Sequence, residues 1–95
     1  MQENYQYPLN LEWTTAEMTT VIHFYNTVEK AYEGGATAQA ILTAYRAFKK
    51  VVPSKMEERQ LDRDFETVSD YSTYQAVKAA RADSKGRVHL KVGEK

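Results

Sequence analysis

Helix start and stop signals recur along this chain of 95 residues and constrain its fold more than any other feature. Threonine or serine is followed three residues later by glutamate or glutamine at Thr14, Ser54 and Ser72. In such a capping box the first side chain accepts a hydrogen bond from the helix backbone and the second side chain bonds back. Breaks are expected at the glycine pair 34–35, because glycine ends helices at little steric cost, and at Pro53, which is not tolerated inside a helix.

These signals predict four helices, near residues 15–33, 37–51, 55–68 and 73–82. Apolar residues within these segments recur at intervals of three and four, which is typical of helices that bury one face. The expected core lies on these faces and consists of Met18, Val21, Ile22, Tyr25, Val28, Ile41, Leu42, Tyr45, Phe48, Leu61, Phe65, Val68 and Val77. The expected fold class is therefore all-α, a compact irregular array of about four short helices.

The two ends of the chain differ from its helical middle. Pro8 disfavours helical backbone in the residue before it, so residues 5–11 are expected to form an extended arm. Residues 87–92 alternate basic or histidine side chains with aliphatic ones, which is the period of a strand. Since one strand is not stable alone, this tail either pairs with the arm, pairs in a dimer or stays mobile. We expect one helical domain over residues 1–82 and a C-terminal tail over 83–95.

Composition and charge disfavour several classes of protein. The chain has 13 basic and 13 acidic side chains, whereas nucleic-acid-binding domains are usually strongly basic. It has no cysteine, which excludes disulfides and thiolate chemistry. It also lacks the apolar run of about 18 residues that a membrane-spanning helix needs, and its start does not resemble a signal peptide. We expect a small cytoplasmic protein that does not bind a membrane, and the balance of charge disfavours nucleic acid as its partner.

The sequence contains no cluster typical of a catalytic or metal site. The two histidines, His23 and His89, are far apart in the sequence, whereas a zinc site needs three or four ligands of defined geometry. Asp62 and Glu66 lie one helical turn apart, but the neighbouring arginines favour a salt-bridged helix surface over acid–base chemistry. We therefore expect no enzymatic activity, no metal and no cofactor.

Two predicted helix starts carry candidate binding residues. Ser54 and Lys55 bring a hydroxyl, an ammonium and free backbone N–H groups together, which can bind a phosphate, although a cap beside an exposed lysine is the simpler interpretation. Tyr71 and Tyr74, with Lys78 one turn further on, either bind a partner protein or pin the chain to the core. Because a short turn joins the last two helices, we expect them to be antiparallel, with the two starts roughly 20 Å apart and in separate pockets.

Two functions remain open at this point. The first is a protein-interaction module without catalytic activity, which the aromatic residues outside the predicted core favour. The alternative is a module that binds nucleic acid or a phosphate-bearing ligand through the basic block over residues 46–55. The net charge of zero favours the first function.

Several motifs also resemble one small protein family. They are Tyr7-Pro8-Leu9, Val28-Glu29-Lys30-Ala31-Tyr32-Glu33, Val52-Pro53-Ser54-Lys55 and Tyr71-Ser72-Thr73-Tyr74. At this spacing the chain resembles, over about residues 5–82, the uncharacterised YktA-type family of Bacillus and related Gram-positive bacteria. It departs from the family pattern at Asn10, Asp70 and Gln75, where the family has aspartate, glycine and arginine. The resemblance implies a compact array of about four helices and supplies no catalytic residue.

Overall fold

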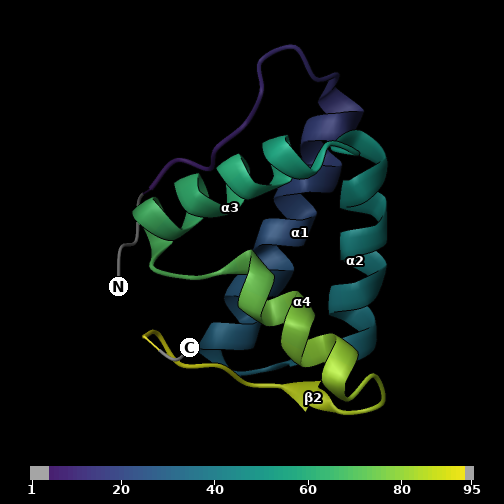
Figure 1. Cartoon of the computed structure of the whole chain (residues 1–95), viewed down its shortest axis with the longest axis vertical. Coiled ribbons are helices and arrows are strands. Elements are labelled where there is room, and N and C mark those ends of the chain that lie inside the picture. The colour runs from purple at the N-terminus through teal and green to yellow at the C-terminus, as the bar shows by residue number, and fades with distance from the viewer. Residues whose placement is uncertain (1–4, 94–95) are drawn as a thin grey trace.

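The computed structural model describes residues 5–93, which form four helices and a short two-stranded sheet. In chain order the elements are α1 (Thr15–Glu33), β1 (Ala36–Thr37), α2 (Ala38–Val51), α3 (Lys55–Ser69), α4 (Thr73–Ala82) and β2 (Arg87–Val88). In Figure 1, α1 and α2 run along the long axis, α3 lies across their upper part, and α4 lies below α3. The predicted all-α class and the four predicted helices are confirmed.

The three predicted capping residues begin α1, α3 and α4, and Thr37 begins α2 in the same way. Thr14 accepts a hydrogen bond from the backbone N–H of Glu17, whose carboxylate accepts one from the backbone N–H of Thr14. Thr37, Ser54 and Ser72 accept the corresponding backbone bond at the starts of α2, α3 and α4. Each cap satisfies a backbone donor that the first turn of a helix otherwise leaves without a partner.

The turn after α3 begins with a residue in an uncommon backbone conformation. Asp70 follows this helix with a φ of 67°, in the left-handed region. Glycine occupies this region without steric cost, and aspartate is one of the few other residues that tolerate it. Aspartate at this position is therefore compatible with the sharp turn between α3 and α4.

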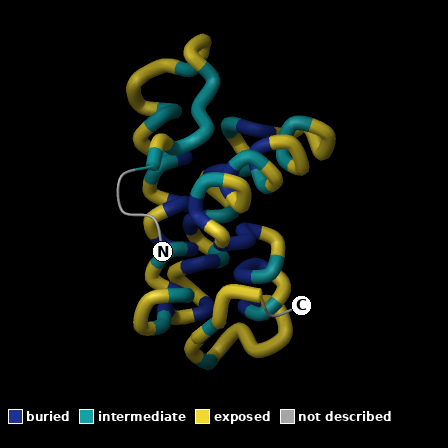
Figure 2. Tube along the Cα trace, turned by 90° about the vertical axis from the view of Figure 1, so that its left-hand side faces the viewer, coloured by how far each residue is buried: buried dark blue, intermediate teal, exposed yellow. Residues whose placement is uncertain are grey.

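The core lies among the four helices, where the buried positions concentrate (Figure 2). Most of the predicted core is buried, namely Val21, Tyr25, Val28, Ile41, Phe48, Leu61, Phe65 and Val77. The remaining predicted positions are only partly buried, namely Met18, Ile22, Leu42, Tyr45 and Val68. These lie at the edges of the apolar faces, so the periodicity identified the faces correctly but not their widths.

The C-terminal tail pairs with a segment that the sequence did not indicate. β2 is antiparallel to β1, with Val88 opposite Ala36 and Arg87 opposite Thr37. Further along, the backbone N–H of Leu90 donates to the carbonyl of Ala31, 2.8 Å away. The strand-like pattern was therefore correct over two residues, but the partner is the connection between α1 and α2. The N-terminal arm does not fill that role.

The N-terminal arm is extended, as predicted, and is held by tyrosine hydrogen bonds. The Tyr7 hydroxyl is shared between two acceptors on α1, Asn26 Oδ1 at 2.7 Å and Glu29 Oε1 at 2.8 Å. The hydroxyl of Tyr25 donates to the carbonyl of Pro8, 3.0 Å away. These bonds attach the arm to α1 before the chain enters that helix (Figure 1).

Candidate functional site

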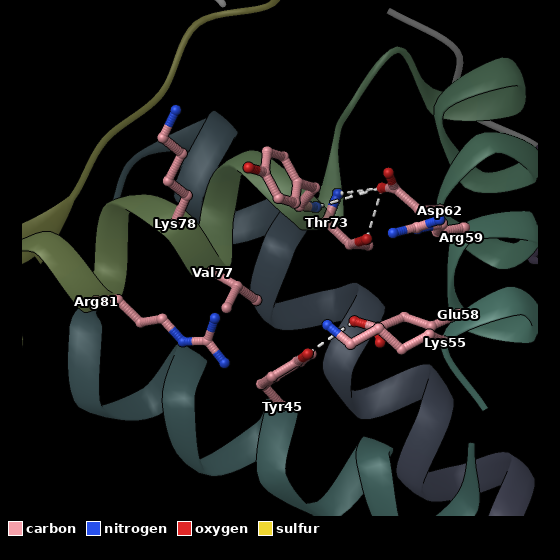
Figure 3. Close-up of a pocket in the computed structure, with 10 residues that line it drawn as sticks. Tyr45, Lys55, Glu58, Arg59, Asp62, Thr73, Val77, Lys78 and Arg81 are labelled. Carbon is pink, nitrogen blue, oxygen red and sulfur yellow. Dashed lines mark hydrogen bonds between the residues drawn. The ribbon is translucent and has the colours of Figure 1, made fainter. Parts of the chain in front are cut away.

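A pocket of about 260 Å³ lies between α3 and α4, with α2 at one side (Figure 3). Helix α3 contributes charged side chains, α4 contributes charged, aromatic and apolar ones, and α2 contributes one tyrosine. The lining residues are Tyr45, Lys55, Glu58, Arg59, Asp62, Thr73, Tyr74, Val77, Lys78 and Arg81.

The first acid of the pocket, Glu58, is bonded to two neighbours. Its carboxylate accepts hydrogen bonds from the Lys49 ammonium and from the Tyr45 hydroxyl, each 2.7 Å away. Burial alone would raise the pKa of this carboxyl, but the two hydrogen bonds and the positive charges of Lys49 and Lys55 outweigh burial and lower it. Burial and the bond to Glu58 raise the pKa of the Tyr45 hydroxyl to about 12.

The second acid, Asp62, fixes α4 against α3. Its Oδ1 accepts hydrogen bonds from the backbone N–H of Thr73 at 3.0 Å, the Thr73 hydroxyl at 2.6 Å and the backbone N–H of Tyr74 at 3.3 Å. A carboxylate at this position also complements the positive end of the α4 dipole. The negative charge of Asp62 is therefore matched by the start of α4.

The four cations that line the pocket differ from these acids, because none is paired with an opposite charge in the described part of the chain. Within residues 5–93, none of Lys55, Arg59, Lys78 and Arg81 forms a salt bridge. The Arg81 guanidinium lies over the Tyr45 ring, 5.4 Å from its centroid. In Figure 3, Lys55, Arg59 and Arg81 extend into the space between α3 and α4, whereas the ammonium of Lys78 points away from it. Clustered charge of one sign in a concave surface attracts ligands of the opposite sign.

The structure brings together two helix starts that the sequence placed in separate pockets. Lys55, Tyr74 and Lys78 line the same pocket, so the expectation of separate pockets was wrong. The physical reason is the turn after α3, which carries the chain back along that helix (Figure 1). The first residues of α4 therefore lie beside Asp62, in the middle of α3, rather than beside the last residues of α3.

Two of the candidate binding residues, Tyr71 and Ser54, make contacts within the fold. Tyr71 is buried, with an exposed fraction of 3%; it stacks on Tyr32 at a centroid distance of 4.5 Å and donates to Glu33. It is not on the surface with Tyr74, whose exposed fraction is 60%. Ser54 does not line the pocket, and its hydroxyl accepts the capping bond of α3.

Sequence reasoning did not identify Arg59, Asp62 and Arg81 as members of a site. A signal exists, because the pocket residues of α3 and, from Tyr74 onward, those of α4 follow the same spacing of three, one and three residues. These positions are 55, 58, 59 and 62 on α3 and 74, 77, 78 and 81 on α4. Such spacing marks one helix face, but the two faces become one site only when the helices are known to face each other.

Metal-binding and membrane-spanning features also bear on the class of protein. Within residues 5–93, no three His, Cys, Asp or Glu side chains are grouped so that they could hold a metal ion. In the same part of the chain, no helix has both the length and the apolar character required to cross a membrane. Fold and pocket together define a small helical protein with a basic pocket.

Comparison with known proteins identifies the family. A family model described as an uncharacterised protein family, UPF0223, matches residues 4–89, and the chain belongs to this family. A UPF0223 protein of Streptococcus pneumoniae (strain CGSP14) is 52% identical over 90 residues, which cover 95% of this chain and 98% of the relative. The UPF0223 protein YfdD of Lactococcus lactis is 56% identical over 85 residues, covering 90% and 91%. The expected membership of a small uncharacterised bacterial family is confirmed, and the match includes β2.

Proposed function

We propose that this protein is a protein-interaction module without catalytic activity, and that it binds an acidic segment of a partner protein in the pocket between α3 and α4. The observation that carries the proposal is the imbalance of charge in the pocket. Lys55, Arg59 and Arg81 extend into a space whose two acids already have partners. An acidic side chain entering this space supplies the missing negative charge.

The size of the pocket supports a side chain of a partner rather than a complete small molecule as the ligand. Pockets for small molecules usually enclose about 300–1,000 Å³. This pocket, at about 260 Å³, is smaller, and it opens beside the exposed ring of Tyr74. Tyrosine and arginine are also the residues that most often dominate the energetics of protein interfaces.

The alternative, a nucleic-acid or phosphate-ligand module built on residues 46–55, has less support because the basic block is divided. Lys49 is paired with Glu58, and Arg46 donates to Thr43, 3.4 Å away. Of this block only Lys55 reaches the pocket. A nucleic-acid backbone needs several cations along one surface, whereas these cations point to different neighbours.

Binding of acidic peptides tests the proposal. Degenerate peptide libraries with a fixed central Glu-Glu or Lys-Lys pair are titrated into the full-length protein and followed by amide NMR. We expect only the acidic library to shift the resonances of the pocket. Arg59→Gln should weaken its binding about tenfold, equivalent to about 1.4 kcal/mol. Lys50→Gln, the same loss of one charge at an exposed position outside the pocket, should leave binding unchanged.

Two results would contradict the proposal. One is binding of both libraries with equal affinity, or an equal effect of the two substitutions. The other is a shift of total RNA or duplex DNA in gels at low salt that Arg59→Gln abolishes, because this would make the basic pocket a nucleic-acid site.

A further inference from the structure

We infer that the partner side chain accepted by this pocket carries a phosphomonoester. The inference rests on the proposed function and names the chemistry of its ligand. It follows from the number of cations that reach one small space, from the way they are held, and from the state of the two acids beside them.

The number of cations exceeds what a carboxylate can match. A carboxylate has one negative charge, which a single arginine satisfies through two parallel hydrogen bonds. A phosphomonoester has about 1.5 to 2 negative charges near neutral pH and three oxygens that accept strong hydrogen bonds. Lys55 and Arg59 from α3 and Arg81 from α4 supply three cationic groups for those oxygens.

One of these cations, Arg81, is already positioned by its neighbours, so less order must be created when it binds an anion. Asp62 bonds α3 to the first turn of α4 and thereby fixes the helix that carries Arg81. The ring beneath Arg81 belongs to Tyr45, whose hydroxyl is in turn fixed by the bond to Glu58. A guanidinium that already rests on an aromatic ring loses less freedom when it binds an anion than a free side chain does.

The two pocket acids do not oppose a dianion as strongly as their number suggests. The Lys49 ammonium, 2.7 Å away, compensates the charge of Glu58. The start of α4 compensates that of Asp62 through three hydrogen bonds. The three cations that extend into the pocket, Lys55, Arg59 and Arg81, therefore remain in excess. Val77 and the Tyr45 ring provide apolar surface for the carbon stem of the ligand.

The direct test compares three degenerate peptide libraries that differ only in the fixed central residue: phosphoserine, glutamate or serine. Each is titrated into the full-length protein and followed by amide NMR. We expect the phosphoserine library to bind at least about tenfold more tightly than the glutamate library, with serine showing no binding, and to shift the resonances of Arg59 and Arg81. Inorganic phosphate and free phosphoserine, titrated alone, should bind much more weakly than the phosphopeptides.

The outcomes separate the inference from the proposed function. Equal affinity for phosphoserine and glutamate libraries would overturn the phosphomonoester inference and leave an acidic-segment module. Lack of binding by both libraries would overturn both. If inorganic phosphate or free phosphoserine bound as tightly as the phosphopeptides, the ligand would be a small anion, and the protein partner would be wrong.

A second measurement uses pH. The second ionisation of a phosphomonoester has a pKa of about 6. The charged and titratable groups facing the pocket are Tyr45 and Lys49 from α2, Lys55, Glu58, Arg59 and Asp62 from α3, and Tyr74, Lys78 and Arg81 from α4. None is a histidine. Affinity for the phosphoserine library should therefore rise several-fold between about pH 5 and pH 7.5, while affinity for the glutamate library stays constant over this range.

Matched variants complete the test. Arg59→Gln should weaken phosphopeptide binding by about tenfold and reduce its pH dependence, without changing the thermal melting curve. Lys50→Gln provides the control for loss of one charge. An equal loss of affinity in both variants would show that only the overall charge matters, and the pocket would be excluded as the site.

Discussion

Tyrosine hydroxyls bond to glutamate carboxylates in two regions, the basic pocket and a group of residues that we call the arm cluster. The two regions differ in the charged side chains that lie beside these bonds. In the arm cluster, which comprises Tyr5, Tyr7, Glu29, Glu33 and Tyr71, the polar groups satisfy one another. Tyr5 and Tyr7 donate to Glu29, and Tyr71 donates to Glu33. No lysine or arginine takes part in these bonds, so the arm cluster is a set of matched donors and acceptors that attaches the N-terminal arm and the α3–α4 turn to α1.

In the pocket the equivalent pair is Tyr45 and Glu58, and it stands beside four cations that form no salt bridge within the described residues. The difference teaches which features of this chain indicate a binding site. Tyrosines outside the helix faces mostly attach segments to each other, as Tyr71 does. Excess charge in a concave surface, rather than aromatic residues by themselves, separates the pocket from the arm cluster. The following predictions test that distinction, beginning with the largest effect.

Substitution of the aromatic residue beneath the arm cluster should cost the most stability. Phe65 is fully buried, stacks on Tyr25 at a centroid distance of 4.5 Å and contacts the ring of Tyr7. We expect Phe65→Ala to lower the free energy of unfolding by about 3–5 kcal/mol, measured by urea denaturation. A change within about 0.5 kcal/mol would show that the face of α3 assigned to the core is wrong.

Alkaline pH should act mainly through the tyrosines on the arm side. Burial, in most cases with a carboxylate acceptor, raises the pKa of the hydroxyls of Tyr5, Tyr7, Tyr25 and Tyr71. Because the folded state holds these protons more tightly than the unfolded state, their contribution is fully present below about pH 10 and is lost as pH rises further. Urea midpoints measured between about pH 8 and pH 11 should therefore fall steeply above pH 10.

The variant Tyr7→Phe sharpens this test, since it removes one of the shifted groups while retaining the ring contacts. Its urea midpoint should depend less steeply on pH above about 10 than that of the wild type. An unchanged dependence would mean that Tyr7 titrates with its ordinary pKa and that the arm does not hold it.

The helices could be predicted because their signals are local. Thr14, Ser54 and Ser72 act on backbone groups within their own first turn, so the sequence contains both partners of each interaction. The turn after α3 was also indicated, since Ser69, Asp70 and Tyr71 interrupt the helical pattern. What these signals do not specify is the direction in which α4 leaves that turn.

The pocket could not be predicted because it depends on that direction. Asp62 and Thr73 are 11 residues apart in the chain, and their bond decides which faces of α3 and α4 meet. The pairing of β1 with β2 is non-local in the same way, because it joins Ala36 to Val88. In sequence alone, Arg59 and Arg81 are two exposed arginines on different helices, and only the packing of those helices makes them neighbours in one site.

Removal of one hydroxyl from the arm cluster should have a moderate effect. Tyr71→Phe keeps the ring that stacks on Tyr32 and deletes the donor to Glu33, 2.7 Å away. We expect a loss of about 0.5–1.5 kcal/mol in urea denaturation, the usual net value of one hydrogen bond. Peptide binding in the pocket should be unaffected. A loss of binding without a loss of stability would show that Tyr71 contributes to binding rather than to the fold.

Low pH should weaken the interaction of Glu58 with Tyr45 and Lys49. The pKa of Glu58 is lowered in the folded state, so its contribution is present above the unfolded value of about 4.3 and is lost as pH falls below it. We expect Glu58→Gln to cost about 1 kcal/mol at neutral pH and clearly less near pH 3, because the wild-type carboxyl takes up protons as pH falls. The same cost at both pH values would show that packing, and not the charge of Glu58, matters.

The smallest effect on stability, and the clearest separation of the two regions, is expected for Tyr74→Ser. Tyr74 has an exposed fraction of 60%, and its backbone N–H, which serine retains, makes the bond to Asp62. The free energy of unfolding should therefore stay within about 0.5 kcal/mol of wild type. If the ring borders the docking surface, affinity for the acidic or phosphoserine library should fall by about tenfold.

Tyr71→Ser is the matched comparison, because it makes the same change three residues earlier at a buried position. It should destabilise the fold and, at temperatures where the variant remains folded, leave the affinity of the pocket unchanged. Reversal of these two patterns would assign binding to the arm cluster and structure to the pocket.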